Sequence, residues 1–262
     1  MPGLDTDSHT RAQNHNPEQE QLSLEKQAQD RLIVALDVSS ADAALNLASR
    51  LERQCRWFKV GLELYIAGGP TIVEKLAARG YSVFLDLKLY DIPNTVASAV
   101  RAAGSLGAQM LTVHAGGGPV MLEAARKAAQ AATKPLQLLA VTVLTSMDQE
   151  QLGAVGVARS PRDHVALLTR MGLAAGIDGF VCSPQEVEAL RAMAGPGAVL
   201  VTPGIRPAGA AVDDQQRIAT PAQALSQGAS YLVVGRPITQ APDPAQAARD
   251  ILDEITGALQ LK

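Results

Sequence analysis

The segment FLDLKLYDIPNT, residues 84–95, holds the densest group of side chains that could do chemistry. Asp86 and Lys88 are two residues apart in a strand-like run, so their side chains emerge on the same face. A lysine beside carboxylates can act as a general acid or form a structural ion pair. Asp91 fits an ordinary helix N-cap equally well, and Pro93 suits the first turn of a helix. The segment alone leaves both interpretations open.

Two further charges come at the ends of the preceding apolar runs. Asp37 ends LIVALD, and Lys59 lies in WFKV. Together with Asp86 and Lys88 they make four charges of alternating sign. In one place, such charges form a coupled network in which perturbed protonation is expected. The presence of all four charges favours a catalytic role for Asp86 and Lys88 over a structural ion pair.

The elements that must position these charges are eight short apolar runs, each followed by a helical stretch rich in Ala and Leu. The runs are LIVALD (32–37), WFKV (57–60), SVFLDLK (82–88), MLTVHA (110–115), LLAVTVLT (138–145), GFVCS (179–183), VLVTPG (199–204) and YLVVGR (231–236). Strands buried on both faces are continuous apolar runs, and regular alternation with helices predicts a parallel sheet. Residues 41–52 and 119–132 predict amphipathic helices, and Gly80, Gly107 and Gly228 fit C-terminal caps.

Eight strand–helix units in about 230 residues predict an α/β chain that forms a closed (β/α)8 TIM barrel. An open doubly wound sheet is the alternative. That fold usually carries a GxGxxG fingerprint after its first strand, and LDVSSAD has none. We therefore expect one barrel-shaped catalytic domain over residues 31–262.

Most predicted strands also end in a polar or charged residue. These are Asp37, Lys59, Asp86 with Lys88, His114, Thr145, Ser183, Thr202 and Arg236. In a (β/α)8 barrel the carboxyl ends of the strands form the active-site face. Burying a charge without a partner costs several kcal/mol, so a ring of such residues indicates a site rather than packing.

The last two predicted strands carry a candidate phosphate site in VTPGIRP and VVGRPIT. Gly204 and Gly235 let backbone N–H groups approach an anion, and Arg206 and Arg236 supply charge-assisted hydrogen bonds. Each Gly–Arg pair could also be a turn with a surface cation. Two such pairs at the position where barrels commonly bind phosphate favour the phosphate site. The polar loop 207–220 could close over it.

Composition excludes several other classes of function. The 262 residues carry a net charge of −3 and no basic run, so neither nucleic acid nor an anionic membrane is an expected partner. Cys55 and Cys182 lack metal-ligand spacing and suit buried thiols in a reducing compartment. No apolar run reaches membrane-spanning length and no signal pattern is visible, so a cytoplasmic location is expected.

Residues 1–30 stand apart as a polar stretch that cannot bury a core. We expect a flexible extension in which Leu22, Leu24 and Ala28 support one or two helical turns. His9 and His15 in this stretch are expected to be solvated and inert.

Six segments taken together resemble a known family. DLKLYDIPNT, VALDV, FKVGLELY, VTVLTSM, VTPGIRP and VVGRPIT are similar, in order and spacing across about residues 31–255, to bacterial orotidine 5′-phosphate decarboxylase. The pattern DxKxxD alone is shared by a wider group of barrel enzymes. The resemblance implies decarboxylation of orotidine 5′-monophosphate (OMP) to uridine 5′-monophosphate (UMP), the last step of de novo UMP synthesis, with no cofactor and no metal.

The resemblance also implies roles for individual residues. Lys88 would deliver a proton to C6 of the pyrimidine as carbon dioxide leaves, and Asp86 would lie beside the substrate carboxylate. Lys59 would join this charged network and, with Asp37, bind ribose hydroxyls. Thr145 would hydrogen-bond the pyrimidine edge.

The phosphate would be held by Arg206, Gly235 and Arg236, with Gln215 bridging phosphate and base. Asp91 and Thr95 would reach into the site of a neighbouring subunit, so the resemblance implies a homodimer with shared sites. His114 is expected in a packing or supporting role and His164 on a helix surface.

Two rival functions remain. A magnesium-dependent barrel acting on a sugar phosphate would share DxKxxD, but such enzymes resemble one another in a Glu near the end of the second strand, where this chain has Lys59. A non-catalytic nucleotide-binding barrel would need Arg206, Arg236 and Gln215 but not the charged network. The joint presence of Asp86, Lys88 and Asp91 argues against it.

Overall fold

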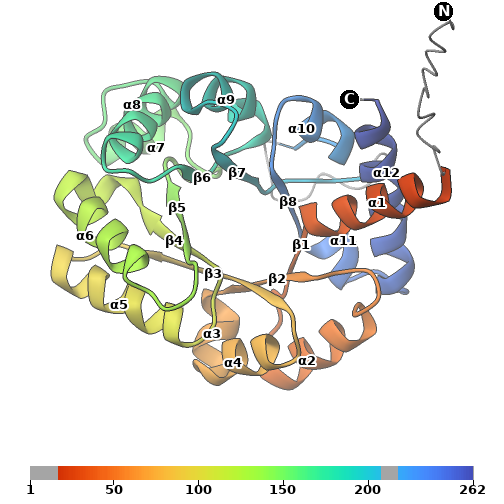
Figure 1. Cartoon of the computed structure of the whole chain (residues 1–262). Helices are drawn as coiled ribbons and strands as arrows, with labels where there is room; N and C mark the ends of the chain where they lie inside the picture. Colours follow the sequence, from red (N-terminus) through yellow and green to blue (C-terminus); the bar gives the residue numbers. More distant parts are fainter. Residues whose placement is uncertain (1–16, 208–217, 262) are drawn as a thin grey trace, which may run out of the picture.

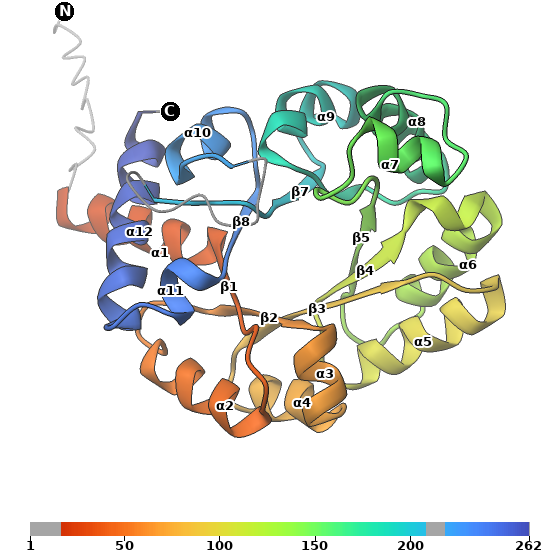
Figure 2. The same cartoon turned by 180° about the vertical axis from the view of Figure 1, so that it is seen from behind.

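Eight parallel strands close into a barrel in chain order, β1 to β8, with a ring of helices around them (Figures 1 and 2). The computed structural model describes residues 17–207 and 218–261. The strands are β1 Leu32–Ala35, β2 Trp57–Gly61, β3 Ser82–Leu89, β4 Met110–His114, β5 Gln137–Val141, β6 Gly179–Val181, β7 Val199–Thr202 and β8 Tyr231–Val234. Each predicted apolar run overlaps one of these strands, so the (β/α)8 barrel is confirmed.

Helices follow the strands on the outside of the barrel. They are α2 Ala41–Arg50, α3 Leu62–Gly68, α4 Thr71–Ala78, α5 Pro93–Ser105, α6 Gly118–Gln130, α7 Gln149–Ala154, α8 Pro161–Ala174, α9 Val187–Ala194, α10 Pro221–Ser226, α11 Arg236–Thr239 and α12 Pro244–Gln260. Side chains cap several of them; Ser40, for example, accepts a hydrogen bond from the backbone N–H of Ala43. Gly80, Gly107 and Gly228 have φ values of 84°, 92° and 106°, which confirms them as helix-ending glycines.

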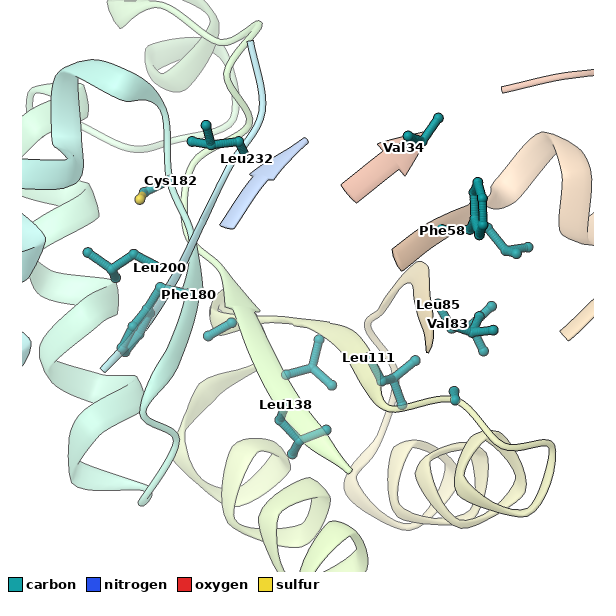
Figure 3. Packing of buried hydrophobic residues seen from close by; sticks show 14 of the residues in the cluster. Val34, Phe58, Val83, Leu85, Leu111, Leu138, Phe180, Cys182, Leu200 and Leu232 are labelled. Atoms are coloured by element: carbon teal, nitrogen blue, oxygen red, sulfur yellow. The ribbon is translucent and has the colours of Figure 1, made fainter. Parts of the chain in front are cut away.

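The hydrophobic core has two layers because strand side chains alternate between the barrel interior and the helices. The interior layer consists of Ile33, Ala35, Phe84, Met110, Leu139, Val201 and Val233. The outer layer lies between sheet and helices, where Phe58, Leu111 and Phe180 are fully buried (Figure 3). Asp37 and Asp86 come two positions after the interior residues Ala35 and Phe84, so they face the open end of the barrel.

Residues 17–31 form a longer helix than the sequence predicts. Helix α1, Pro17–Arg31, has fifteen residues and lies against α12 (Figures 1 and 2). Ala28 is fully buried, and Gln260 donates a hydrogen bond to Gln21 at 3.3 Å. Because most of its residues are polar, contact with the barrel rather than its own amphipathicity must stabilise it. His9 and His15 lie outside the described residues.

Arg191 ties α9 to the turn before β8. Its guanidinium donates to the carbonyls of Gly195, Ala198 and Gly228 at 2.7–2.8 Å and to the Ser230 hydroxyl at 3.0 Å. This hydrogen-bonding is local to the end of the barrel opposite the charged residues. It should therefore affect stability rather than chemistry.

We expect Arg191→Met to lower the free energy of unfolding by roughly 3–5 kcal/mol, because several carbonyls lose a charged donor at once. Urea denaturation measures the effect as a lower midpoint. Arg170→Met, at an exposed position on α8, is the matched control and should change stability by less than about 0.5 kcal/mol. Equal effects of the two substitutions would contradict the assigned role.

Candidate active site

A cavity of about 470 Å³ opens at the carboxyl ends of the strands. Its polar and charged lining residues are Asp37, Lys59, Asp86, Lys88, Thr145, Arg206, Arg236 and Gln240. Apolar residues of β1, β3, β5, β6, β7 and β8 also line it. The strand alternation thus brings together side chains that are about 200 residues apart in the sequence.

A larger recess of about 910 Å³ lies at the opposite end of the barrel. Trp57, Met110, Val199 and Tyr231, the first residues of their strands, contribute to its wall. None of the four charges of the predicted network lines this recess. The smaller cavity is therefore the candidate active site.

The four charges form a continuous chain across the mouth of this cavity. The Lys59 Nζ lies 2.9 Å from Oδ1 of Asp37 and 3.8 Å from Oδ2 of Asp86. The Lys88 Nζ lies 2.9 Å from both carboxylate oxygens of Asp86. The side chains of Lys59 and Asp86 are only 12% and 13% exposed, so little water screens their charges. Positive and negative groups alternate, as the sequence predicts.

Gly61 gives the Lys59 ammonium its space. A Cβ atom at this position would lie 2.9 Å from the Lys59 Nζ and 3.4 Å from Oδ1 of Asp37. Any larger residue would therefore push the ammonium away from the carboxylate. The motif FKVG contains this glycine, but only the folded strand reveals which atom it accommodates.

The carboxyl ends of β7 and β8, the latter paired with β1, carry the candidate phosphate site. Arg206 is only 6% exposed, and Gly204 has a φ of 80°, a left-handed conformation that favours glycine. Gly235 precedes α11, and a Cβ there would point toward Asp37 at ordinary contact distance, 3.7 Å from its Oδ2. Arg236 and Gln240 complete this site. Gln240 was not predicted from the sequence, because it follows the last residue of the motif VVGRPIT.

Two predicted residues lie elsewhere, and one lies outside the described chain. Asp91 and Thr95 are exposed and do not line the cavity. Asp91 is not the N-cap that one interpretation allowed: the N-cap of α5 is Ile92, whose N–H donates to Oδ1 of Asp91 at 2.6 Å. Pro93 begins α5 as predicted. Gln215 and most of the proposed closing loop lie outside the described residues.

Three of the polar residues at the predicted strand ends lie away from the cavity, among them His114, which was expected only in a packing or supporting role. His114, Ser183 and Thr202 do not line the cavity. Ser183 and Thr202 are fully buried, and the Thr202 Oγ1 lies 3.9 Å from the Sγ of Cys182. The neighbour of Thr202, Val201, belongs to the interior layer, so alternation turns Thr202 outward. A polar residue at a strand end can therefore line the cavity only if the alternation along its strand turns the side chain toward the barrel interior.

The remaining titratable groups have supporting positions. The His114 ring packs 5.7 Å from Tyr90, and burial, then the charge of Lys88, lowers the pKa of this histidine. His164 is a half-buried residue of α8 whose pKa burial also lowers. Burial raises the pKa of both Cys55 and Cys182 to about 12, which leaves them as unreactive thiols at neutral pH.

The described part of the chain contains neither a cluster of metal ligands nor a membrane-spanning helix. No three or more His, Cys, Asp and Glu residues there lie close enough together to hold a metal ion. No helix within residues 17–207 or 218–261 is long and apolar enough to cross a bilayer.

Comparisons with known proteins agree with the resemblance. Residues 30–251 match the model of the orotidine 5′-phosphate decarboxylase / HUMPS family. Among curated proteins, orotidine 5′-phosphate decarboxylases from Nitrosococcus oceani and Halorhodospira halophila are 53% and 55% identical, covering 86% and 87% of this chain and 97% of each relative. The crystal structure of the Lactobacillus acidophilus orotidine 5′-phosphate decarboxylase is 39% identical with a TM-score of 0.77, covering 86% of this chain and 99% of that one. Because both the family model and these relatives span most of its length, the chain belongs to the orotidine 5′-phosphate decarboxylase / HUMPS family.

Proposed function

We propose that the protein decarboxylates OMP to UMP and carbon dioxide, the last step of de novo UMP synthesis. One observation carries the proposal: the Lys88 ammonium, held 2.9 Å from both oxygens of Asp86, shares one cavity with Arg206 and Arg236. An ammonium group after β3 and two guanidinium groups after β7 and β8 suit a substrate with a reacting carbon and a phosphate. The activity named for the relatives is the same.

The reaction breaks the bond between C6 of the pyrimidine and its carboxylate. The electron pair of this bond stays on C6, and the carboxylate leaves as carbon dioxide. Lys88 stabilises the developing carbanion by its charge and then donates an ammonium proton to C6, giving UMP. The resulting amine regains a proton from solvent. Asp86 orients Lys88 and lies beside the departing carboxylate.

The energetics require more than one lysine. At about 4 Å and an effective dielectric near 20, a charge pair is worth about 4 kcal/mol. Enzymes lower barriers by roughly 8–23 kcal/mol, so the remainder must come from elsewhere. Contacts of Arg206 and Arg236 with the distant phosphate are the proposed source, expressed as binding energy in the transition state. Asp37 and Lys59 would hold the ribose between these two ends, with Thr145 at the base.

The magnesium-dependent alternative is less well supported because of Lys59. Its ammonium lies between the carboxylates of Asp37 and Asp86. A divalent cation would need the same place and would be repelled by this charge. The network therefore favours chemistry performed by side chains alone.

Product identification tests the proposed function. Purified protein is incubated with OMP, and UMP and carbon dioxide are quantified; separate reactions contain 3-keto-gulonate 6-phosphate with Mg²⁺. We expect one UMP and one carbon dioxide for each OMP consumed, and no turnover of the sugar phosphate. Turnover of the sugar phosphate alone would assign the protein to the other branch of the group.

We further propose a homodimer that pairs the cavity-bearing faces. Exposed large apolar residues gather on the segments that follow β2, β3 and β4. They are Leu62, Ile66, Tyr90, Ile92 and Val120, between 51% and 80% exposed. A patch of this kind beside a cavity indicates a protein interface, and Asp91 and Thr95 lie in the same region. Through the dimer they would reach the partner's cavity.

Mixing two inactive variants tests this sharing. Lys88→Ala and Asp91→Ala homodimers should each be nearly inactive, since every site in them lacks one group. Random exchange makes half of the dimers mixed, and each mixed dimer has one intact site, so about a quarter of the wild-type activity should return. Mass spectrometry of isotopically labelled subunits confirms the exchange. No recovery after exchange would count against shared sites.

A further inference from the structure

Lys88 has a backbone conformation that its residue type disfavours. Its φ is 51°, and it is the one non-glycine residue with positive φ among residues 17–207 and 218–261. Contact between the Cβ and the backbone makes this region unfavourable for L-residues. Such strain persists only where the surroundings hold the residue in place. Some neighbouring group must therefore constrain Lys88.

The irregular pairing of β3 with β4 shows where the constraint comes from. Leu85 pairs with Leu111 and Leu89 with Val113, and the register shifts between them. Residues 86–88 of β3 thus face Thr112 alone on β4. A bulge of this kind bends the strand and re-aims its side chains. It also removes the regular ladder hydrogen bonds that would otherwise hold the strand.

Thr112 replaces these lost contacts with its side chain. Its Oγ1 accepts a hydrogen bond from the backbone N–H of Lys88 at 2.8 Å and donates to Oδ1 of Asp86 at 3.0 Å. Both directions are chemically required, because an N–H can only donate and the hydroxyl has a single proton for the carboxylate. Thr112 is fully buried, so no water competes for either bond.

We infer that Thr112 is a positioning residue for the Lys88–Asp86 pair, an inference that rests on the proposed function of Lys88. One hydroxyl fixes both the strained backbone of Lys88 and the carboxylate that contacts its ammonium. The Lys88 Nζ is consequently held at the same distance, 2.9 Å, from both oxygens of Asp86. Thr112 acts through these two residues and contributes no reacting atom.

Three variants separate this role from simple packing. Thr112→Val keeps the shape and removes the hydroxyl, whereas Thr112→Ser keeps the hydroxyl. Thr169→Val is the matched control: Thr169 is also fully buried, and its Oγ1 donates to the Val165 carbonyl at 2.8 Å in α8. Each variant is assayed for kcat and KM with OMP, for UMP affinity and for its unfolding temperature.

We expect Thr112→Val to lower kcat about 10- to 100-fold, because a displacement of about 1 Å can cost this much, while KM and UMP affinity stay within about threefold. Thr112→Ser should recover most of the loss, and Thr169→Val should leave kcat unchanged. Near-normal kcat in Thr112→Val would overturn the inference. So would an equal loss in Thr169→Val at a similar fall in unfolding temperature.

A crystal structure of Thr112→Val gives a readout independent of activity. Lys88 should leave the positive φ region, or its Nζ should move away from one Asp86 oxygen. Unchanged Lys88 geometry overturns the inference even if the wild-type protein acts on another substrate. Conversely, displaced geometry in a protein without OMP turnover would support positioning by Thr112 and refute the proposed function alone.

Discussion

Replacing Lys88 by alanine is expected to lower kcat for OMP decarboxylation by at least about 10⁴-fold. A positioned proton donor contributes about 10²- to 10⁴-fold, and the lost charge removes further stabilisation of the carbanion at C6. UMP affinity should change less than about tenfold, because Arg206 and Arg236, which come from β7 and β8 and not from β3, remain to bind the phosphate. Stopped assays and isothermal titration measure the two quantities separately.

Lys75→Ala is the control for this substitution. Lys75 is an exposed lysine of α4 that does not line the cavity. It should retain normal kcat and UMP affinity. Near-normal decarboxylation by Lys88→Ala would remove Lys88 from the proposed role. A parallel loss of UMP binding would instead indicate that the substitution damages the cavity.

The second large loss of activity is expected when the proposed phosphate contact of Arg236 is removed. Arg236→Ala should lower kcat/KM for OMP by roughly 10- to 100-fold, because a hydrogen bond to a charged group contributes about 1.5–3 kcal/mol. Orotidine, which lacks the phosphate, should be processed slowly and at the same rate by both proteins, within about threefold. The ratio of the two kcat/KM values therefore measures the phosphate contact directly.

Arg162→Ala provides the comparison for Arg236→Ala. Arg162 is an exposed arginine at the start of α8 and should leave both substrates unaffected. If Arg236→Ala slows OMP and orotidine equally, the substitution acts on the whole cavity and not on a phosphate contact.

Much of the fold follows from local patterns. The eight apolar runs each overlap a strand, because burial on both faces leaves a signal in consecutive residues. The helix-ending glycines were equally predictable, since positive φ selects for glycine. The length of α1 was not predictable from its own residues. Its stability depends on α12, more than 200 residues later in the sequence.

The candidate site was predictable where charge and spacing coincide. The four charges lie in one network because their strands are adjacent and all four side chains point toward the barrel mouth. They are Asp37, Lys59, Asp86 and Lys88. The same reasoning failed for Thr202, where the strand turns the side chain toward the helices.

No pattern in the sequence predicts the positioning role of Thr112. A threonine within an apolar run is ordinary, and only the irregular register between β3 and β4 places its hydroxyl between Lys88 and Asp86. Such register shifts are set by long-range pairing and cannot be read from either strand alone.

We propose that side chains alone, with Lys88 as the cation, decarboxylate OMP. The most direct measurement is the loss of OMP absorbance on adding purified protein that has been treated with a chelator. We expect complete conversion at a rate that added Mg²⁺ does not change. No loss of absorbance, or a loss that appears only when Mg²⁺ is restored, would contradict it.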